Sequence, residues 1–344
     1  MGNRFLSIFS NDLAIDLGTA NTLVYKKRKG IVLNESSVVA LRTDRVNGHR
    51  VLAVGQEARQ MMGKTPGNVI TIRPMRDGVI ADFEATGVML RQFIRRVRSR
   101  MSLFKPRMII AVPSGISSVE RRAVRESAEM SGAGTVFLIE EPMAAAVGAD
   151  MPVSEPTCNM IADIGGGTTE VAVISLGGIV FGLSIKVAGD KMDEAIIRHV
   201  KKQYNFLIGE RTAEEVKISI GNACPDSRNS ERIEVKGWEV VSGKPMILLL
   251  TDMEVREAIS DHLKAIGDAI KTVLEKIPQE LAAHVLDTGI VLTGGVALLK
   301  NLDKYLARET GLPVRVAEDP LTTVVRGSGK ILDNRHLFKK ILSP

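Results

Sequence analysis

Two glycine-rich stretches of the sequence each follow a carboxylate at the end of a short apolar run. The first, "DLGTANT", begins at Asp16, and the second, "DIGGGTTE", begins at Asp163. Glycine weakens a strand, so three in a row indicate that the backbone turns tightly or comes very close to another group. Backbone N–H groups in such a turn form a concavity that binds phosphate oxygens. The predicted chemistry is therefore the binding of a polyphosphate.

The two aspartates before these turns predict a metal site. Mg²⁺ keeps several waters and is commonly bound through one or two carboxylates together with substrate phosphates. Neither turn matches a Walker loop or a dinucleotide fingerprint, because the sequence has no GxxxxGK[ST] and no strand-GxGxxG-helix. Taken alone, each turn is equally compatible with a structural role. Two of them, facing each other across a cleft, would clamp one polyphosphate.

Two further stretches have a functional and a structural interpretation. Gly294 and Gly295 follow an apolar run at 290–292, and they either let a base or ribose approach the backbone or form a plain connection. Glu140 and Glu141 precede Pro142, which suits the first turn of a helix. Acids at a helix N-terminus complement its dipole, but one of these carboxylates could instead orient an attacking water.

The elements that would position these residues alternate between strands and helices. Strands are expected at 13–16, 22–25, 108–112, 159–163, 170–175, 178–187, 290–292 and 314–317, and helices near 83–98, from 118, and near 193–204. Capping-box spacing occurs three times before helical patterns, in the pairs Ser117 and Glu120, Thr212 and Glu215, and Thr251 and Glu254. Alternation of this kind predicts an α/β architecture in which helices cover sheets.

The pattern also repeats within the chain. Aligning "AIDLGTANTLVY" with "IADIGGGTTEVAV" places Asp16 over Asp163, with the following glycines and threonines in register. Both segments are a strand, an aspartate, a small-residue turn and a second strand. This similarity favours an internal duplication, with one hairpin in each of two similar domains.

Composition narrows the possible classes. The 344 residues exceed a usual single core, so two domains are expected. Aromatic residues are only 4%, so platforms for single-stranded nucleic acid are not expected. Cys158 and Cys224 form neither a CxxC motif nor a disulfide framework, which fits a reducing compartment. The net charge of +6 permits an acidic partner, and the basic run at 26–29 is expected to be a hairpin tip. No apolar run is long enough for a spanning helix or a signal peptide, so we expect a cytoplasmic protein.

In order, "DLGTANT", "EEPMAAA", "DIGGGTTE", "TGG" and "DPLTTVVRGSG" resemble the phosphate-1, connect-1, phosphate-2, adenosine and connect-2 motifs of the actin-like ATPases. Segments such as "RPMRDGVIADF" and "GDKMDEAII" resemble the bacterial actins in particular, and the resemblance covers nearly the whole chain. It implies an actin-like fold with two similar α/β domains, each with a smaller subdomain, around a nucleotide cleft. Domain I is expected to comprise residues 1–149 and 320–344, and domain II residues 150–319.

The resemblance also implies ATP or ADP and Mg²⁺ as ligands and assigns roles by position. Glu141, with help from Thr168, would polarise the attacking water, although Glu140 is a near alternative. Asp16 and Asp163 would hold water around Mg²⁺. The remaining nucleotide contacts would come from Gly18, Thr19, Ala20, Asn21, Gly165, Gly166, Gly167, Glu214, Glu215, Val216, Lys217, Gly294, Gly295, Val296 and Ala297. Val296 stands where the family usually has a third glycine, and because a β-branched residue disfavours a left-handed backbone, weaker adenosine binding is expected.

The implied activity is slow ATP hydrolysis that accelerates when polymerisation closes the cleft. The implied partners are other copies of the chain in filaments, the anionic inner face of the cytoplasmic membrane, and membrane proteins of the elongation and wall-synthesis machinery. Three alternatives remain open. A sugar-kinase-type phosphotransferase would need a general base for its acceptor, usually an Asp in the cleft. A chaperone-type ATPase would need a substrate domain, for which no residues follow Pro344. A scaffold would bind nucleotide without turnover.

Two apolar segments are candidate membrane anchors. The first is "MGNRFLSIFS", whose predicted anchor residues are Phe5, Leu6, Ile8 and Phe9. In a helix, Met1, Phe5, Ile8 and Phe9 would form one apolar stripe. The alternative is that this segment is a frayed tail. Leu6 occupies the position at which a myristoylation site needs Ser or Thr. Leu103 and Phe104 lie within a basic segment and resemble a membrane-insertion loop, although a helix end packed into the core is equally compatible. Basic residues beside apolar ones favour anionic lipid.

Overall fold

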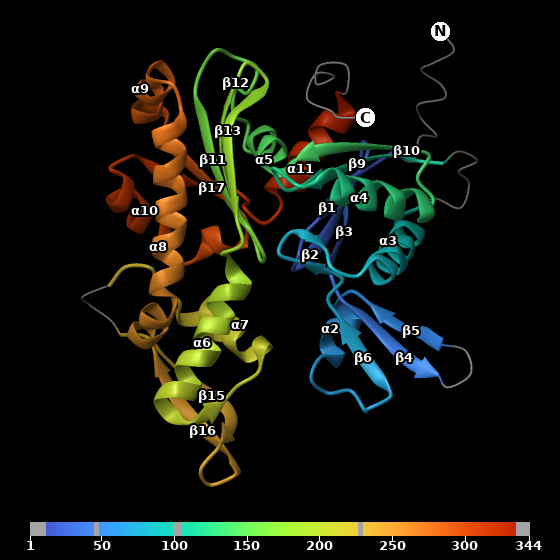
Figure 1. The fold of residues 1–344 in the computed structure, drawn as a ribbon, viewed down its shortest axis with the longest axis vertical. Helices are drawn as coiled ribbons and strands as arrows, with labels where there is room; N and C mark the ends of the chain where they lie inside the picture. The colour runs from blue at the N-terminus through green and yellow to red at the C-terminus, as the bar shows by residue number, and fades with distance from the viewer. Residues whose placement is uncertain (1–11, 45–47, 99–104, 226–229, 335–344) are drawn as a thin grey trace.

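The chain folds into two lobes that stand side by side (Figure 1). The computed structural model describes residues 12–44, 48–98, 105–225 and 230–334. Each lobe is built around a five-stranded sheet, and each carries a smaller three-stranded sheet at the same end of the molecule. The predicted α/β class, with two similar halves and a smaller unit on each, is confirmed.

The first lobe contains a mixed sheet built from two hairpin connections and two parallel additions. Its strands are β1 (Leu13–Leu17), β2 (Asn21–Lys26), β3 (Gly30–Ser36), β9 (Arg107–Val112) and β10 (Thr135–Glu140), in the order β10-β9-β1-β2-β3. β1 pairs antiparallel with β2 and parallel with β9. The tip between β2 and β3 contains Lys27 to Lys29, as predicted for this basic run.

The second lobe repeats this topology. Its strands are β11 (Asn159–Ile164), β12 (Thr169–Ser175), β13 (Gly178–Ile185), β17 (Ile290–Thr293) and β18 (Val314–Val316), in the order β13-β12-β11-β17-β18. β11 pairs antiparallel with β12 and parallel with β17, as β1 does with β2 and β9. The same succession of pairings in both sheets confirms the internal duplication.

Alternation of side chains along the strands creates one outer and one inner layer in the first lobe. On β1, Leu13, Ile15 and Leu17 join the core under α3 (Phe83–Val97) and α4 (Ser118–Met130). Ala14 faces the other way and joins a second core that includes α5 (Glu141–Gly148) and α11 (Thr323–Asp333).

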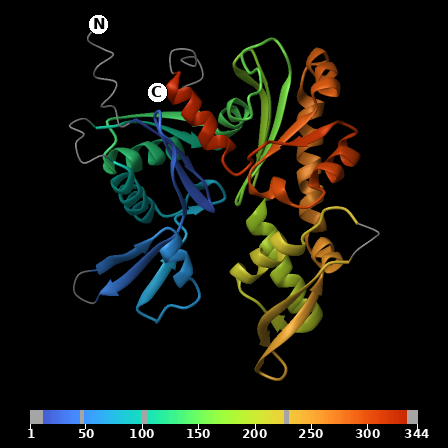
Figure 2. The ribbon, with the colours of Figure 1, turned by 180° about the vertical axis from the view of Figure 1, so that it is seen from behind.

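The inner layer is shared by the two lobes. It contains Ala14 and Ile109 of the first sheet, Ile161 and Ala172 of the second, and apolar residues of α5 and α11. Figure 2 shows α11 between the lobes when the molecule is seen from behind. Residues Val171 and Val173 on the opposite face of the second sheet join an outer core, which is covered by the helices α6 (Gly189–Tyr204), α8 (Asp252–Lys276), α9 (Gln279–Thr288) and α10 (Leu302–Thr310).

Smaller units are inserted between the strands of each lobe. The first lobe carries β4 (Val39–Asp44), β5 (Gly48–Val54), β6 (Val69–Ile72), α2 (Gln56–Met61) and the short hairpin β7 (Met75–Arg76) and β8 (Val79–Ile80). The second carries β14 (Phe206–Leu207), β15 (Arg232–Glu239), β16 (Lys244–Thr251) and α7 (Glu210–Ile220), and η2 (Gly295–Leu298) follows β17.

The helix starts test the capping predictions. Ser117 and Thr251 both cap their helices with the reciprocal bonds of a capping box. The prediction for Thr212 is wrong, because α7 begins at Glu210 after Gly209 and Thr212 lies inside it. Helix α6 begins at Gly189, earlier than the predicted 193–204. Its first N–H groups donate to the carbonyls of Gly165 and Gly166, which lie far away in the sequence.

Within the described residues, no helix is both long and apolar enough to cross a bilayer. The predicted anchor residues Phe5, Leu6, Ile8, Phe9, Leu103 and Phe104 lie outside the described residues.

Candidate functional site

A cavity of about 420 Å³ lies between the two lobes. Many of the predicted site residues line this cavity. They come from five segments: the two glycine-rich hairpins, the start of α5, the helix α7 and the turn after β17. They are Asp16, Gly18, Thr19, Ala20, Asn21, Glu141, Asp163, Gly165, Gly166, Gly167, Thr168, Glu214, Lys217, Gly294, Gly295 and Val296. The fold thus brings segments from both halves of the sequence to one site.

The first hairpin turns through Gly18 and Thr19 between β1 and β2. A methyl carbon on Gly18 would lie 2.6 Å from the carbonyl oxygen of Asn21, so only glycine fits this turn without displacement. Ser37 stabilises the turn. Its Oγ donates to the Gly18 carbonyl at 2.7 Å and is hydrogen-bonded to Thr22 Oγ1 at 2.9 Å. The N–H groups of the turn are therefore held in a fixed position at the cavity.

In the second hairpin, two of the three consecutive glycines lie close to the first hairpin. A methyl carbon on Gly166 would lie 3.1 Å from Ala20 Cβ, and one on Gly167 would lie 2.6 Å from Thr19 Oγ1. None of the three glycines has a positive φ angle. Gly166 and Gly167 are therefore favoured by the close approach of the first hairpin rather than by an unusual backbone conformation, whereas a methyl carbon on Gly165 would meet only the Thr168 carbonyl oxygen, at 3.4 Å.

A third turn, between β7 and β8, lies between the two hairpins and was not predicted as part of the site. The N–H of Gly78 donates to Thr19 Oγ1 at 3.2 Å, and a methyl carbon on Gly78 would lie 2.8 Å from Thr168 Cγ2. The Asp77-Gly78 dipeptide signals a turn in the sequence. Its place beside both hairpins depends on tertiary packing.

Strand alternation also explains where the carboxylates lie. Asp16 has the same phase as Ala14, and Asp163 the same phase as Ile161, so both follow residues of the inner layer. Glu141 begins α5 within that layer, and Glu170 has the phase of Ala172. Four carboxylates therefore gather beneath the hairpins.

This gathering disfavours the charged forms of the carboxylates. Burial, and then the charge of Asp163, raise the pKa of Asp16 to about 7. Burial raises the pKa of Asp163 to about 7 as well. For Glu141, burial and then the charges of Glu170, Asp16 and Asp163 raise the pKa well above its usual range. A bound cation would stabilise the charged forms of these carboxylates.

Asp16 and Asp163 fit the predicted Mg²⁺ in their chemistry. Each offers acceptor-only oxygens at the edge of the cavity, and each is destabilised without a compensating charge. Among the described residues, no three His, Cys, Asp or Glu side chains form a group that could enclose a metal ion. Two carboxylates, with water and phosphate oxygens completing the shell, match the preference of Mg²⁺ for hydrated sites.

The structure separates the two adjacent glutamates. Glu141 lines the cavity, whereas Glu140 forms an ion pair with Arg121 at 3.3 Å and is absent from the lining. Thr168 also lines the cavity and is buried. Of the two glutamates, Glu141 is therefore the one placed to contact a ligand in the cavity.

On α7 only some of the predicted residues face the cavity. Glu214, Lys217 and Ile218 line it, at the i, i+3 and i+4 positions that share one face of a helix. Glu215 instead pairs with Arg211 on the surface, and Val216 is buried in the outer core. Glu215 and Val216, which were predicted to contact the nucleotide, therefore point away from the cavity because they lie on other faces of the helix. Ile218, with 70% of its surface exposed, was missed.

At the turn after β17, Gly294 rather than position 296 has the left-handed backbone, with φ of +82°. A methyl carbon on Gly294 would lie 2.3 Å from the carbonyl oxygen of Ile164. Val296 lies in η2 without a positive φ, so the backbone reason for expecting weaker adenosine binding is wrong. Ala297 is buried in the core and does not line the cavity.

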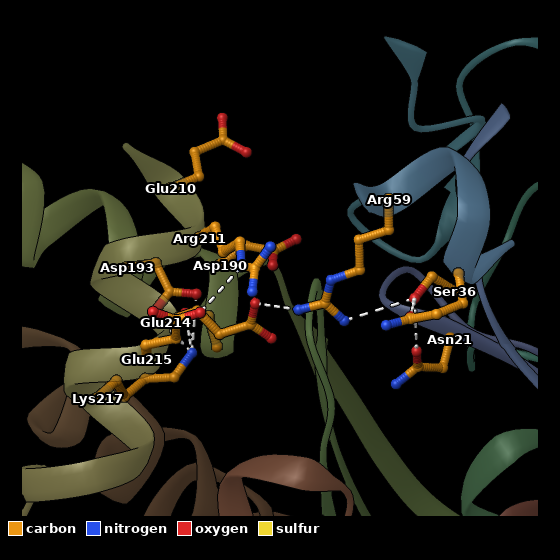
Figure 3. A network of polar contacts seen from close by, with 12 residues as sticks. Asn21, Ser36, Arg59, Asp190, Asp193, Glu210, Arg211, Glu214, Glu215 and Lys217 are labelled. Atoms are coloured by element: carbon orange, nitrogen blue, oxygen red, sulfur yellow. Dashed lines mark hydrogen bonds and ion pairs between the residues drawn. The ribbon is translucent and has the colours of Figure 1, made fainter. Parts of the chain in front are cut away.

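Charged residues of α2, α6 and α7 come together between the two lobes (Figure 3), and Asp190 and Glu214 among them line the cavity. Arg59 of α2 forms an ion pair with Glu214 of α7. Arg73 lies 3.6 Å from Asp190 and 3.3 Å from Glu210. These pairs join the first lobe to the second on the side opposite the shared inner layer.

Behind these pairs, Lys217 is held by two residues of α6. Its Nζ lies 2.8 Å from Asp193 Oδ1 and donates to the Gly189 carbonyl at 2.9 Å. Burial raises the pKa of Asp193 to about 6, although Lys217 opposes that shift. Asp190 and Asp193, both in the cavity lining, were not among the predicted site residues, and Asp190 lies before the expected start of the helix at 193.

Comparison with known proteins gives consistent results along the whole chain. The family described as "MreB/Mbl protein" matches residues 10–340. The cell shape-determining protein MreB of Escherichia coli K12 is 55% identical over 335 residues, covering 97% of this chain and 96% of that protein. The cell shape-determining protein Mbl of Bacillus subtilis 168 is 51% identical over 333 residues, covering 97% of this chain and 99% of that protein.

Solved structures agree with this assignment. MreB5 of Spiroplasma citri bound to AMPPNP superposes with a TM-score of 0.87 at 36% identity, covering 96% of this chain and 97% of that one. A MamK double helical filament structure matches with a TM-score of 0.79 at 23% identity, covering 94% and 99%, which shows a shared fold. The predicted actin-like fold is confirmed, and the chain belongs to the MreB/Mbl family.

Proposed function

We propose that the chain binds ATP or ADP with Mg²⁺ between its two glycine-rich hairpins and hydrolyses ATP slowly. The observation that carries this proposal is the meeting of both hairpins in one cavity above a group of carboxylates. The N–H groups of both turns and the side chains of Thr19, Asn21 and Thr168 would donate to phosphate oxygens. The Spiroplasma citri relatives bound to AMPPNP and ADP support the same ligands for this chain.

Asp16 and Asp163 would hold Mg²⁺ through water, and the bound ion would neutralise charge on the phosphates. Compensation of these two carboxylates removes two of the causes that raise the pKa of Glu141. Glu141, which lines the cavity together with Thr168, would then orient and polarise the attacking water. Positioning and electrostatics are sufficient for this chemistry, since phosphoryl transfer requires no covalent intermediate with the protein.

The other end of the cavity would bind the nucleoside. Lys217 and Glu214 provide polar groups there, and Ile218 provides an apolar surface. Gly294, Gly295 and Val296 line the cavity as well. We propose a division into domain I, residues 1–149 and 320–344, and domain II, residues 150–319. The membership of the two five-stranded sheets supports this division.

We also propose that the chain forms filaments at the inner face of the cytoplasmic membrane. There it would organise wall synthesis together with membrane proteins of the elongation machinery. The names of the cell shape-determining relatives and the filament formed by MamK support it. The apolar segments that contain Phe9 and Phe104 would attach the filament to the bilayer. A filament presents many weak anchors together, so avidity would compensate for their shortness.

One experiment tests these statements together. Purified full-length chain is incubated with ATP, Mg²⁺ and anionic vesicles, then examined by electron microscopy while phosphate release is measured. Filaments on the vesicles with slow phosphate release are expected. Phosphate transfer to a small acceptor without polymer would instead identify a kinase, and filaments without phosphate release would identify a scaffold that binds nucleotide without turnover.

A further inference from the structure

A second groove, of about 480 Å³, lies between the β2–β3 hairpin and the end of α3, outside the cavity already described. Three cations and one carboxylate share its lining with apolar and amide side chains. The lining residues are Lys26, Lys29, Val32, Leu33, Asn34, Glu35, Arg96 and Val97. The nucleotide site uses none of them.

The lysines of this groove lack a compensating charge. Lys26 is only 7% exposed, and its Nζ donates to the carbonyl oxygen of Val97 at 3.0 Å. In the described parts of the chain, no carboxylate lies within ion-pair distance of Lys26 or Lys29. Burial, and then the charge of Lys29, lower the pKa of Lys26. Two neighbouring ammonium groups in a partly desolvated groove favour an anion.

The carboxylate in the groove is already engaged. Glu35 Oε1 accepts from Arg96 at 2.9 Å, and its Oε2 accepts from the N–H of Gln56 at 2.7 Å. The bond from Lys26 to the Val97 carbonyl satisfies the end of α3. That bond uses one of the three donors of an ammonium group. It also gives no role to Lys29, so helix capping alone does not account for the pair of lysines.

The groove also has an apolar side. Val32, Leu33 and Val97 belong to its lining, and Val32 is 39% exposed. A small inorganic anion would make no use of such residues. An amphiphile, with a charged headgroup beside hydrocarbon, would contact both kinds of surface.

Described residues that flank the two predicted anchor segments are hydrogen-bonded to each other or to the β2–β3 hairpin. The N–H of Lys27 donates to the Asp12 carbonyl at 3.1 Å, and Arg107 N donates to Asp12 Oδ1 at 3.1 Å. Lys26 in turn bonds Val97. The described residues that follow Phe9 and those that flank Leu103 and Phe104 in the sequence thus converge on the β2–β3 hairpin.

We propose that this groove binds the phosphate headgroup of an anionic phospholipid, with Lys26 and Lys29 contacting the phosphate and Val32 contacting the adjoining apolar part. The inference rests on the proposed membrane association and adds a defined lipid site to it. The anchors would supply insertion into the bilayer, and the groove would supply selectivity for anionic lipid.

The chain offers a matched pair of variants for the test. Lys29→Gln and Lys27→Gln each remove one charge from the same hairpin tip, but only Lys29 lines the groove. Binding of the full chain to vesicles of phosphatidylcholine with phosphatidylglycerol is measured by co-sedimentation at constant ionic strength. We expect about fivefold weaker binding for Lys29→Gln, corresponding to about 1 kcal/mol for one lysine near an anionic surface, and a clearly smaller loss for Lys27→Gln. Unchanged thermal melting of both variants serves as the folding control.

The outcomes separate the possible failures. Equal losses for the two variants would show diffuse attraction and overturn the site, while leaving membrane association intact. Absence of wild-type binding to the vesicles would overturn both proposals. A parallel measurement follows acylation of Lys26 and Lys29 by mass spectrometry. Protection by phosphatidylglycerol vesicles but not by glycerol phosphate supports the lipid site, and equal protection by glycerol phosphate would assign the groove to a soluble phosphate instead.

Discussion

Thr19 and Gly167, from hairpins in the two halves of the sequence, lie against each other, and both line the cavity. A methyl carbon on Gly167 would lie 2.6 Å from Thr19 Oγ1 and 3.0 Å from the backbone nitrogen of Asp77. Three separate turns therefore meet without room for a single additional carbon. The width of the proposed phosphate site depends on this contact, and most of the predictions below test the cavity that it defines.

Gly167→Ala should weaken nucleotide binding at least tenfold, because the new methyl group forces the two hairpins apart. The affinity can be measured by titration with a fluorescent ATP analogue. Gly67→Ala is the matched control, since a methyl carbon there meets nothing within 4 Å and φ is not positive. Gly166→Val should have a similar or larger effect. Wild-type affinity in both site variants would contradict the phosphate cradle.

Glu141→Gln should retain ATP but release phosphate about 10² to 10⁴ times more slowly, the range associated with loss of a general base. The amide preserves the shape of the side chain and removes its ability to accept a proton. Glu140→Gln serves as the comparison, because Glu140 pairs with Arg121 outside the cavity lining. If the Glu140 variant loses activity while the Glu141 variant does not, the two roles have been assigned to the wrong residues.

The ion pair of Arg59 and Glu214 should slow nucleotide release by joining the lobes beside the cavity. The side chains are 29% and 25% exposed, so a contribution of about 0.5–1 kcal/mol is expected, equivalent to a two- to fivefold faster release for Arg59→Ala. Stopped-flow displacement of a fluorescent nucleotide measures this rate.

Arg211→Ala is the control for this pair, because Arg211 and Glu215 pair within α7 and do not bridge the lobes. In a double-mutant cycle, Arg59→Ala should have little further effect on release once Glu214→Ala has removed its partner, and this comparison cancels the contact that Glu214 itself makes with the nucleotide. A full Arg59→Ala effect in the Glu214→Ala background would argue against a direct attraction.

The raised carboxyl pKa values predict opposite pH effects on stability and on metal binding. Asp16 and Asp163 have folded-state pKa values of about 7, above the unfolded value of roughly 4. Their contribution to the stability of the nucleotide-free protein is therefore fully present below pH ~4 and is lost as the pH rises through about 7. In a melting series from pH 5 to pH 8, Asp163→Asn should show a smaller decline than wild type.

Binding of Mg²⁺ with ATP should strengthen over the same interval, because the cation competes with protons at Asp16 and Asp163. Each displaced proton gives up to about a tenfold gain in affinity per pH unit below the pKa. Calorimetric titration at pH 6, 7 and 8 measures this slope. A slope that is unchanged in Asp163→Asn would exclude this carboxylate from the metal site.

Deleting residues 1–9 together with Leu103→Ser and Phe104→Ser should abolish co-sedimentation with anionic vesicles, because both apolar anchors are removed. Phosphate release measured without lipid should remain, since both hairpins and Glu141 are left unchanged in this variant. Undiminished vesicle binding would place the membrane contact elsewhere on the chain.

The sequence by itself determined the local features of the site. Asp16, Asp163 and the glycines after them could be recognised because a strand, a tight turn and a second strand are set by neighbouring residues. The caps of α4 and α8 were predictable for the same reason, since a capping box spans only four residues. The duplicated topology followed from two such local patterns.

Only the tertiary structure decided which side chains face the cavity. Helix α7 presents Glu214 and Lys217 but turns Glu215 and Val216 away, and this phase could not be assigned from a contiguous motif. Gly78 joins the site through contacts with Thr19 and Thr168, which are distant in sequence. The early start of α6 depends likewise on carbonyls of the second hairpin. Each of these features arises from packing between remote segments, and local propensity contains no information about that packing.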